Sequence, residues 1–241
     1  MAATAAAAAG SPLLGNRTAQ ASEALLGELL VARLRDAMLG LGQPPVTPPA
    51  ETLATDFTRA LADFDACRYA SLAVRLPRLI RSGHALTASA REAGDYVLLA
   101  KSYLLATRML VKLDEQQLGW MAADRARQLA EAGGAPLAVA ESAQQLAVLA
   151  RKAGWHQEAL SIALTAADHP DLRSAGRAGT ALRGLLVQSA EVAAQAVSPA
   201  GCVAFGSDGR VCVSHPLWGS VLHSSVRMRR HCDQRLSGPG A

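Results

Sequence analysis

A pattern of small residues around a tight turn occurs twice in this chain and restricts its fold more than any other feature. One copy runs from Leu146 to Ala166 around Gly154, and the other runs from Ala106 to Ala126 around Asp114. Each copy has two small residues seven positions apart in its second half: Gly119 with Ala126, and Ala159 with Ala166. Positions seven apart lie on one helix face, so the second helix can pack closely against the first. The pattern predicts helical hairpins that repeat along the chain.

Repeated helical hairpins of this kind are typical of tetratricopeptide-like repeats, which stack into an α-solenoid. The period from Gly119 to Ala159 is 40 residues, longer than the roughly 34 of the common repeat. Aromatic residues make up only 4% of the chain, and alanine and leucine dominate it, which favours closely packed helices. We therefore expect an all-α fold. The expected helices are Leu53–Asp65, Tyr69–Arg81, Asp95–Lys112, Gln116–Ala132, Pro136–Ala153, His156–Ala167 and Ala175–Ala196.

Composition divides the chain into four parts. Residues 1–20 form an Ala-rich leader that we expect to be disordered, because Gly10, Pro12 and Gly15 interrupt it. Residues 21–50 hold an amphipathic helix over 22–39 and a stiff Pro-rich linker. Residues 51–197 form the helical repeat domain, and residues 198–241 form an irregular, basic tail that contains cysteine and histidine.

The tail accounts for most of the net charge of +4. It contains five arginines against two aspartates, whereas residues 1–197 contain 19 basic and 18 acidic residues. The repeat domain therefore has no bias towards nucleic acid. Because the composition changes abruptly after Ala196, the tail is either a shifted reading frame, a native disordered tail or a folded one. The last helix, 175–196, is expected to have no partner that covers its apolar face.

No motif in the sequence predicts catalysis, a metal or another cofactor. Three cysteines and three histidines of the tail have no standard ligand spacing; they are Cys202, Cys212, His215, His223, His231 and Cys232. Four acids of the first helical pair have the spacing of surface acids; they are Glu51, Asp56, Asp63 and Asp65. We interpret Cys67, in a turn between helices, as a small packing residue without a disulfide. We do not expect the protein to be an enzyme.

A partner or ligand is expected to bind along the helix 95–112. Two residue pairs on it, each seven apart, share a face: Tyr96 with Tyr103, and Lys101 with Arg108. Aromatic and cationic side chains lining a groove could hold a peptide or an acidic ligand, whereas the same residues could also be an ordinary amphipathic face. Trp120 and Trp155 are candidate hot spots or packing residues between repeats.

Residues 51–196 resemble the C-terminal repeat region of actinomycete transcriptional regulators that carry an XRE-type helix-turn-helix at their N-terminus. The resemblance lies in four segments: 69–80 (YASLAVRLPRLI), 110–113 (LVKL), 120–126 (WMAADRA) and 149–154 (LARKAG). It implies a sensor and dimerisation module. Residues 1–50 contain no pair of short helices around a glycine turn, so we do not expect direct DNA binding.

We therefore expect a cytoplasmic, regulatory protein-interaction module that takes part in transcriptional regulation. A helical-repeat groove would bind a protein or peptide, and the chain could form a homo-oligomer or associate with a full-length regulator. The sequence contains no apolar run long enough for a membrane span. The alternative is a small-ligand receptor whose groove closes on an amphiphilic signal without a protein partner.

Overall fold

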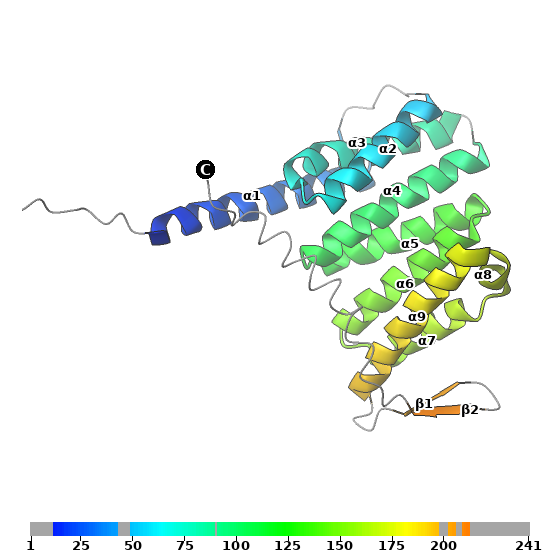
Figure 1. Cartoon of the computed structure of the whole chain (residues 1–241). Helices are drawn as coiled ribbons and strands as arrows, with labels where there is room; N and C mark the ends of the chain where they lie inside the picture. The colour runs from blue at the N-terminus through cyan, green and yellow to red at the C-terminus, as the bar shows by residue number, and fades with distance from the viewer. Residues whose placement is uncertain (1–11, 43–48, 90, 198–201, 206–208, 213–241) are drawn as a thin grey trace, which may run out of the picture.

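The computed structural model describes residues 12–42, 49–89, 91–197, 202–205 and 209–212, and the part up to residue 197 is helical (Figure 1). The predicted all-α class is confirmed for this part of the chain. The expected linker at 43–48, the leader before residue 12 and the tail after residue 212 lie outside the described residues. The elements are α1 Pro12–Met38, α2 Ala50–Asp65, α3 Tyr69–Ser89, α4 Ala93–Lys112, α5 Gln116–Ala132, α6 Pro136–Lys152, α7 His156–Ala167, α8 Pro170–Ser174, α9 Gly176–Val197, β1 Cys202–Phe205 and β2 Gly209–Cys212.

The same turn connects helices at four places in the repeat domain. Each turn has one residue with positive φ: Cys67 at 57°, Asp114 at 62°, Gly134 at 63° and Gly154 at 82°. This left-handed residue lets the next backbone amide bond a carbonyl five residues back, as between Trp155 N and Ala150 O at 2.8 Å. The bond satisfies a carbonyl at the helix end and reverses the chain. Identical turns therefore give successive helices the same antiparallel geometry.

The helices pack in a regular order. Helices α2 and α3, α4 and α5, and α6 and α7 form hairpins, while α2, α4, α6 and α9 also contact one another in sequence. These hairpins lie one below another in Figure 1, from α2 and α3 at the top to α7 and α9 at the bottom. Helix α1 packs against α3, and its N-terminal part extends away from the other helices.

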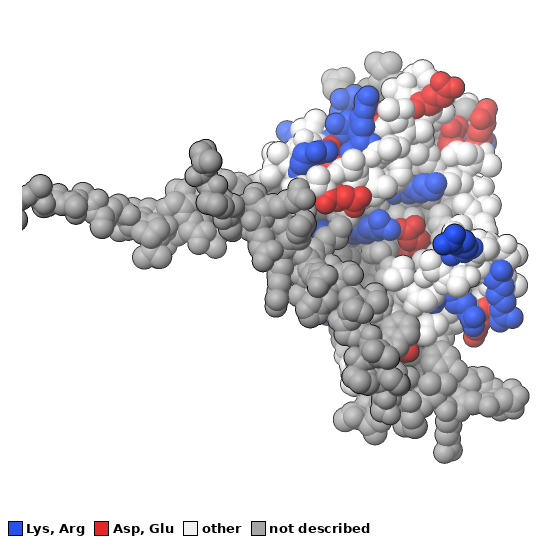
Figure 2. All heavy atoms as spheres, viewed as in Figure 1, with Lys and Arg blue, Asp and Glu red and all other residues white. Residues whose placement is uncertain are grey.

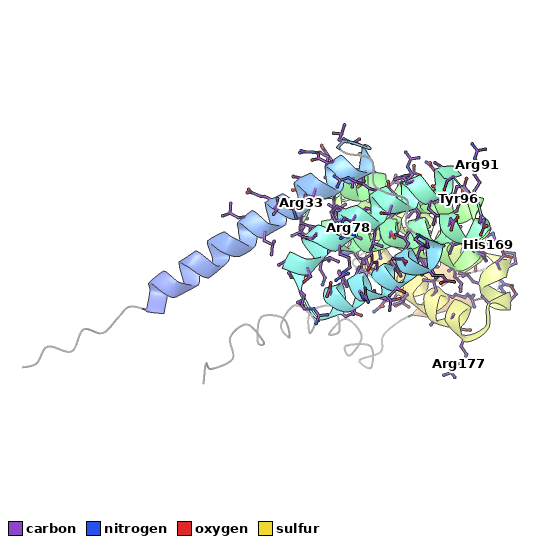
Figure 3. All side chains as sticks on the ribbon, turned by 90° about the horizontal axis from the view of Figure 1, so that it is seen from above. Arg33, Arg78, Arg91, Tyr96, His169 and Arg177 are labelled. Carbon is purple, nitrogen blue, oxygen red and sulfur yellow. The ribbon has the colours of Figure 1, made fainter. Side chains whose placement is uncertain are left out.

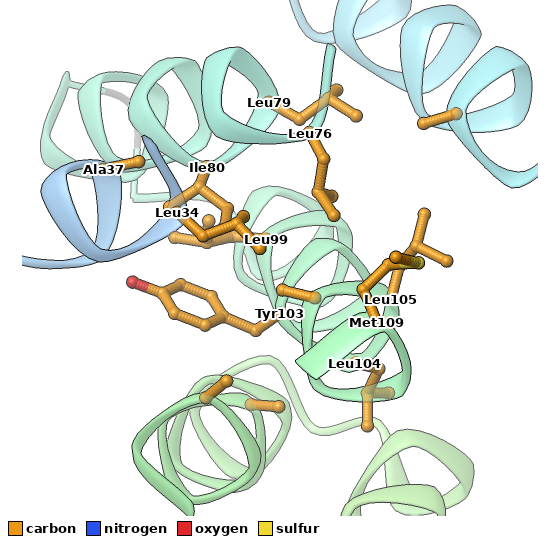
Figure 4. Packing of buried hydrophobic residues seen from close by; sticks show 14 of the residues in the cluster. Leu34, Ala37, Leu76, Leu79, Ile80, Leu99, Tyr103, Leu104, Leu105 and Met109 are labelled. Carbon is orange, nitrogen blue, oxygen red and sulfur yellow. The ribbon is translucent and has the colours of Figure 1, made fainter. Parts of the chain in front are cut away.

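The core combines leucine clusters with alanine faces. Leu34 from α1, Ile80 from α3 and Leu99 and Leu105 from α4 are all fully buried in one cluster (Figure 4). Helix α5 contributes only small side chains to its buried face: Gly119, Ala122, Ala123, Ala126 and Ala130. The repeated small residues of the sequence are thus largely buried, since Ala159 is also inaccessible. Small side chains let α5 and α7 approach their neighbours closely.

Helix α9 is not left uncovered, so this expectation was wrong. It contacts α6, α7 and α8, and it buries Leu186, Ala190 and Ala193. The cause is the short helix α8, which begins at Pro170, where the sequence predicted no helix between Ala167 and Ala175. By adding one turn, α8 redirects the chain so that α9 lies against α7.

Both ends of the helical part also differ from expectation. Helix α1 begins at Pro12 and not at Ser22. Proline is well tolerated in the first turn of a helix, and a glycine inside a helix costs only about 1 kcal/mol, so the interrupting residues did not stop it. Beyond α9, strands β1 and β2 pair antiparallel with Cys202 opposite Cys212, in the part of the chain that was expected to be an irregular tail.

The packing of α8 against α9 can be tested at two glycines of α9, because one is crowded by α8 and the other faces open space. A Cβ at Gly179 would lie 2.0 Å from the backbone oxygen of Leu172, whereas a Cβ at Gly184 would meet nothing within 4 Å. We expect Gly179→Ala to lower the free energy of unfolding by about 1–3 kcal/mol, because the backbone of α8 must move. Gly184→Ala should raise it by about 0.5–1 kcal/mol through helix propensity.

Urea denaturation followed by circular dichroism measures both changes. Equal effects of the two substitutions would contradict the close approach of α8 to α9.

Candidate functional site

The six residues predicted to bind a partner lie in three different environments. Tyr103 is in the core, Tyr96, Lys101 and Arg108 lie along α4 at the surface, and Trp120 and Trp155 contact each other elsewhere. The structure therefore does not bring these six residues together as the lining of one groove.

Tyr103 is a core residue, contrary to its predicted place in a groove. Only 1% of it is exposed, and its hydroxyl lies 2.7 Å from Nε2 of His84 on α3. The two rings also meet edge to face, with centroids 5.7 Å apart. Burial raises the pKa of Tyr103 to about 12, and burial likewise lowers the pKa of His84. Both groups therefore favour their neutral forms, and the pair joins α3 to α4 inside the protein.

The other predicted residues of α4 lie at the surface, but two of them are half-buried and one of these is paired with another helix. Lys101 is exposed, whereas Tyr96 and Arg108 are half-buried. Tyr96 lies at the end of the helix stack where Arg91 and His169 are also found (Figure 3). The guanidinium of Arg108 forms an ion pair with Glu141 of α6. Arg108 thus links two hairpins, which leaves Lys101 as the fully exposed cation of the predicted set.

Trp120 and Trp155 form an aromatic pair between two hairpins. Their ring centroids are 5.6 Å apart with an angle of 38° between the planes. Trp120, on α5, is half-buried and packs against the small cluster of Ala150, Ala159 and Ala193. Trp155, just before α7, is 55% exposed. Packing between repeats thus accounts for Trp120, but most of the Trp155 ring faces solvent.

The backbone around Trp155 is fixed on both sides. Its amide bonds Ala150 O in the α6–α7 turn, and its carbonyl accepts from Ala159 N at 2.9 Å. The preceding helix end is held by Lys152, whose Nζ lies 2.6 Å from Asp114 and 3.2 Å from Val111 O in the neighbouring turn. The hydrogen bond from Lys152 also lowers the pKa of Asp114. Trp155 is thus an exposed aromatic side chain on a pre-organised backbone.

Two of the four acids of α2, Asp56 and Asp63, form ion pairs, and Asp63 is not at the surface as expected. Asp63 is 5% exposed and binds Arg68 at 2.9 Å and Arg75 at 3.1 Å. Burial acts to raise the pKa of Asp63, but the two arginines outweigh it and hold the pKa below its usual value. Arg75 also reaches Asp56, so these acids tie α2 to α3. Cys67, in the turn between them, is disulfide-bonded in the structure, contrary to its interpretation as a packing residue.

The described residues form no metal centre, and the face shown in Figure 2 has no large patch of a single charge. Among the described residues, no three histidine, cysteine, aspartate or glutamate side chains gather in a metal-binding group. Basic and acidic side chains are interspersed over the face shown in Figure 2. None of the described helices combines the length and apolar character needed to cross a membrane.

Sequence reasoning missed the partners that decide how the predicted residues behave. His84 binds Tyr103, Glu141 binds Arg108, and Asp114 binds Lys152. The last two pairs join residues more than thirty positions apart, 33 and 38 respectively. Only the repeat period near 40 residues could have indicated that such positions become neighbours. No family model, curated protein or solved structure matches this chain.

The raised pKa of Tyr103 predicts how stability depends on alkaline pH. The unfolded tyrosine ionises near pH 10, whereas the buried one stays neutral up to about pH 12. Its stabilising contribution is therefore complete below pH 10 and is lost as pH rises to 12. We expect the difference in unfolding free energy between the wild type and Tyr103→Phe to shrink by about 2 kcal/mol over this range.

Urea denaturation at several pH values between 9 and 12 gives this difference. Ionisations of other groups occur in both proteins and cancel. A difference that stays constant with pH would show that Tyr103 is not buried as described.

Proposed function

We propose that this protein is a regulatory interaction module that binds a protein or peptide partner, with Trp155 as the central anchor. The observation that carries the proposal is the exposed Trp155, whose ring meets Trp120 at a tilt and whose backbone is hydrogen-bonded on both sides of the turn. Tryptophan is enriched among the residues that dominate binding energy at protein interfaces. A fixed backbone reduces the conformational entropy that a partner's binding must overcome.

We further propose that the helices form a tetratricopeptide-like solenoid. Support comes from the recurring left-handed turns and from the contacts that join α2, α4, α6 and α9 in order. Such stacks present extended surfaces made of rigid helices and commonly act as binding scaffolds. The ion pairs Arg108–Glu141 and Lys152–Asp114 support this by holding adjacent hairpins in fixed positions.

The regulatory role rests on the resemblance of residues 51–196 to the sensor region of transcriptional regulators. We propose that the partner is a second copy of the chain or a relative that carries a DNA-reading domain. On this view the protein would alter DNA binding by its partner and not contact DNA itself. The interspersed charges on the face shown in Figure 2 agree with a protein partner better than with the phosphate backbone.

The small-ligand alternative is favoured by a separate observation. A cavity of about 350 Å³ lies at the edge formed by the α5–α6 turn and α8. It does not include any of the predicted α4 residues or either tryptophan. On this alternative the protein is a small-ligand receptor that needs no protein partner.

Substitution of Trp155 tests the proposed function. Trp155→Ala should weaken partner binding by at least about tenfold, because truncating a hot-spot residue typically costs 2 kcal/mol or more. Leu185→Ala on α9 is the matched control, since Leu185 is likewise exposed, at 46%, and lies away from the tryptophan pair.

Self-association is measured by analytical ultracentrifugation of the three proteins. A different partner is measured by quantitative affinity capture from the native host, followed by calorimetry with the purified candidate. If Trp155→Ala retains every interaction that the wild type and Leu185→Ala make, Trp155 is not the anchor.

A further inference from the structure

A half-open cavity near α8 is a feature of the described residues that the proposed interaction does not use. Its walls come from the end of α5, the start of α6, the end of α7 and α8. They are mainly apolar and include Pro136, Val139, Ala140, Ala143, Ala166 and Leu172. A volume of about 350 Å³ lies at the lower end of the range for small-molecule pockets. It is large enough for a small ligand but too small for a helix.

The cavity exists because the repeat is interrupted at this point. In the preceding hairpin the end of α5 lies directly against the start of α4: a Cβ on Gly133 would lie 2.7 Å from Val97 and 2.9 Å from Ala93 O. After α7, the chain instead passes through His169 into α8 before α9 begins. The small alanine side chains of α6 and α7 do not fill the space that this detour opens. The opening is therefore a local departure from the regular stack.

The rim of the cavity is polar and electronegative. Glu131, His169 and Asp171 are its ionisable lining residues, with no lysine or arginine among the described residues that line it. The Asp171 amide donates to Nδ1 of His169 at 3.4 Å, and a carboxylate oxygen of Asp171 lies 3.6 Å from the same nitrogen, so the imidazole is positioned at the rim. Arg127 contacts Glu131 at 2.8 Å, but the same guanidinium is shared with Asp124 at 2.8 Å. Two carboxylates at the rim against one shared guanidinium leave an excess of negative charge.

Helix ends of both signs meet the cavity, so helix dipoles do not decide its charge preference. The C-terminal turns of α5 and α7 lie beside it, and so do the N-termini of α6 and α8. Pro136, the first residue of α6, has no amide hydrogen to offer an anion. The carboxylates of Glu131 and Asp171 therefore favour a cation at the rim, and the apolar walls favour an apolar group inside.

We infer that this cavity is a second binding site, for a small amphiphilic amine. The apolar part of the ligand lies against Val139, Ala143 and Leu172, and its ammonium group lies at the rim between Glu131 and Asp171. The site is separate from Trp155, so a ligand and a protein partner bind without sharing a residue. Helix α8 forms one wall of the cavity, and α9 packs against α8. A ligand in the cavity therefore helps to hold α8 and α9 in place.

Three probes of one chain length test the charge preference of the site: n-octylamine, 1-octanol and octanoate, all below their micellar concentrations. Isothermal titration calorimetry with the full chain should show octylamine binding at least about tenfold more tightly than octanoate, with octanol in between. Octylamine should also raise the melting temperature, because a ligand that binds only the folded state stabilises it. Octanoate binding as tightly as octylamine would overturn the inference.

Two variants locate the binding in the cavity. Ala143→Leu fills the space and should abolish octylamine binding, whereas Ala181→Leu, at an exposed position of α9, should not change it. The double variant Glu131→Gln, Asp171→Asn keeps the shape of the site and should remove the preference for the amine while octanol still binds.

Octylamine binding that survives Ala143→Leu, or an amine preference that survives the double variant, would place the ligand elsewhere and refute the proposal. Circular dichroism checks that each variant is folded. Trp155→Ala should bind octylamine like the wild type, so this result is independent of the outcome for the protein partner.

Discussion

The left-handed turn between helices is the constraint on which the structure depends. At Cys67, Asp114, Gly134 and Gly154 the backbone takes a positive φ, and a hydrogen bond across the turn closes each helix. Only then does the next helix start in the direction that lets it pack on the one before. Two of the four positions are glycine, for which this conformation costs least, and aspartate and cysteine take it where their neighbours hold them. Without these turns the alanine faces of α5 and α7 would have no surface to meet.

Small residues give close helix packing where the stack is regular and leave a cavity where it is not. Within the regular α4–α5 hairpin, glycine lets the helices approach so closely that a Cβ on Gly133 would lie 2.9 Å from Ala93 O. Where α8 lengthens the connection, the same alanines leave a cavity of about 350 Å³. Small side chains cannot extend to fill a space that the backbone opens. The same small residues therefore give close packing in the regular hairpins and a cavity beside α8. The proposed small ligand binds in that cavity.

The two proposed sites use different physical means. Trp155 offers a large apolar surface that is already ordered by its turn and by the Lys152–Asp114 ion pair. The cavity instead presents apolar walls rich in alanine, with the carboxylates of Glu131 and Asp171 among its lining residues. Tyr103 and Asp63 belong to neither site, since their hydrogen bonds to His84 and to Arg68 and Arg75 hold helices together. Perturbed pKa values thus mark structural pairs in this protein.

The sequence by itself determined the helical class, the hairpin order and the start and end of helices such as α5 and α7, because periodicity, turn residues and proline act locally. It could not determine which side of each helix would be covered. Tyr96 and Tyr103 are equivalent by spacing, yet only Tyr103 meets His84 and is fully buried. The covering of α9 and the cavity beside α8 also depend on how one short helix redirects the chain. These features arise from contacts between residues distant in sequence, which tertiary packing alone decides.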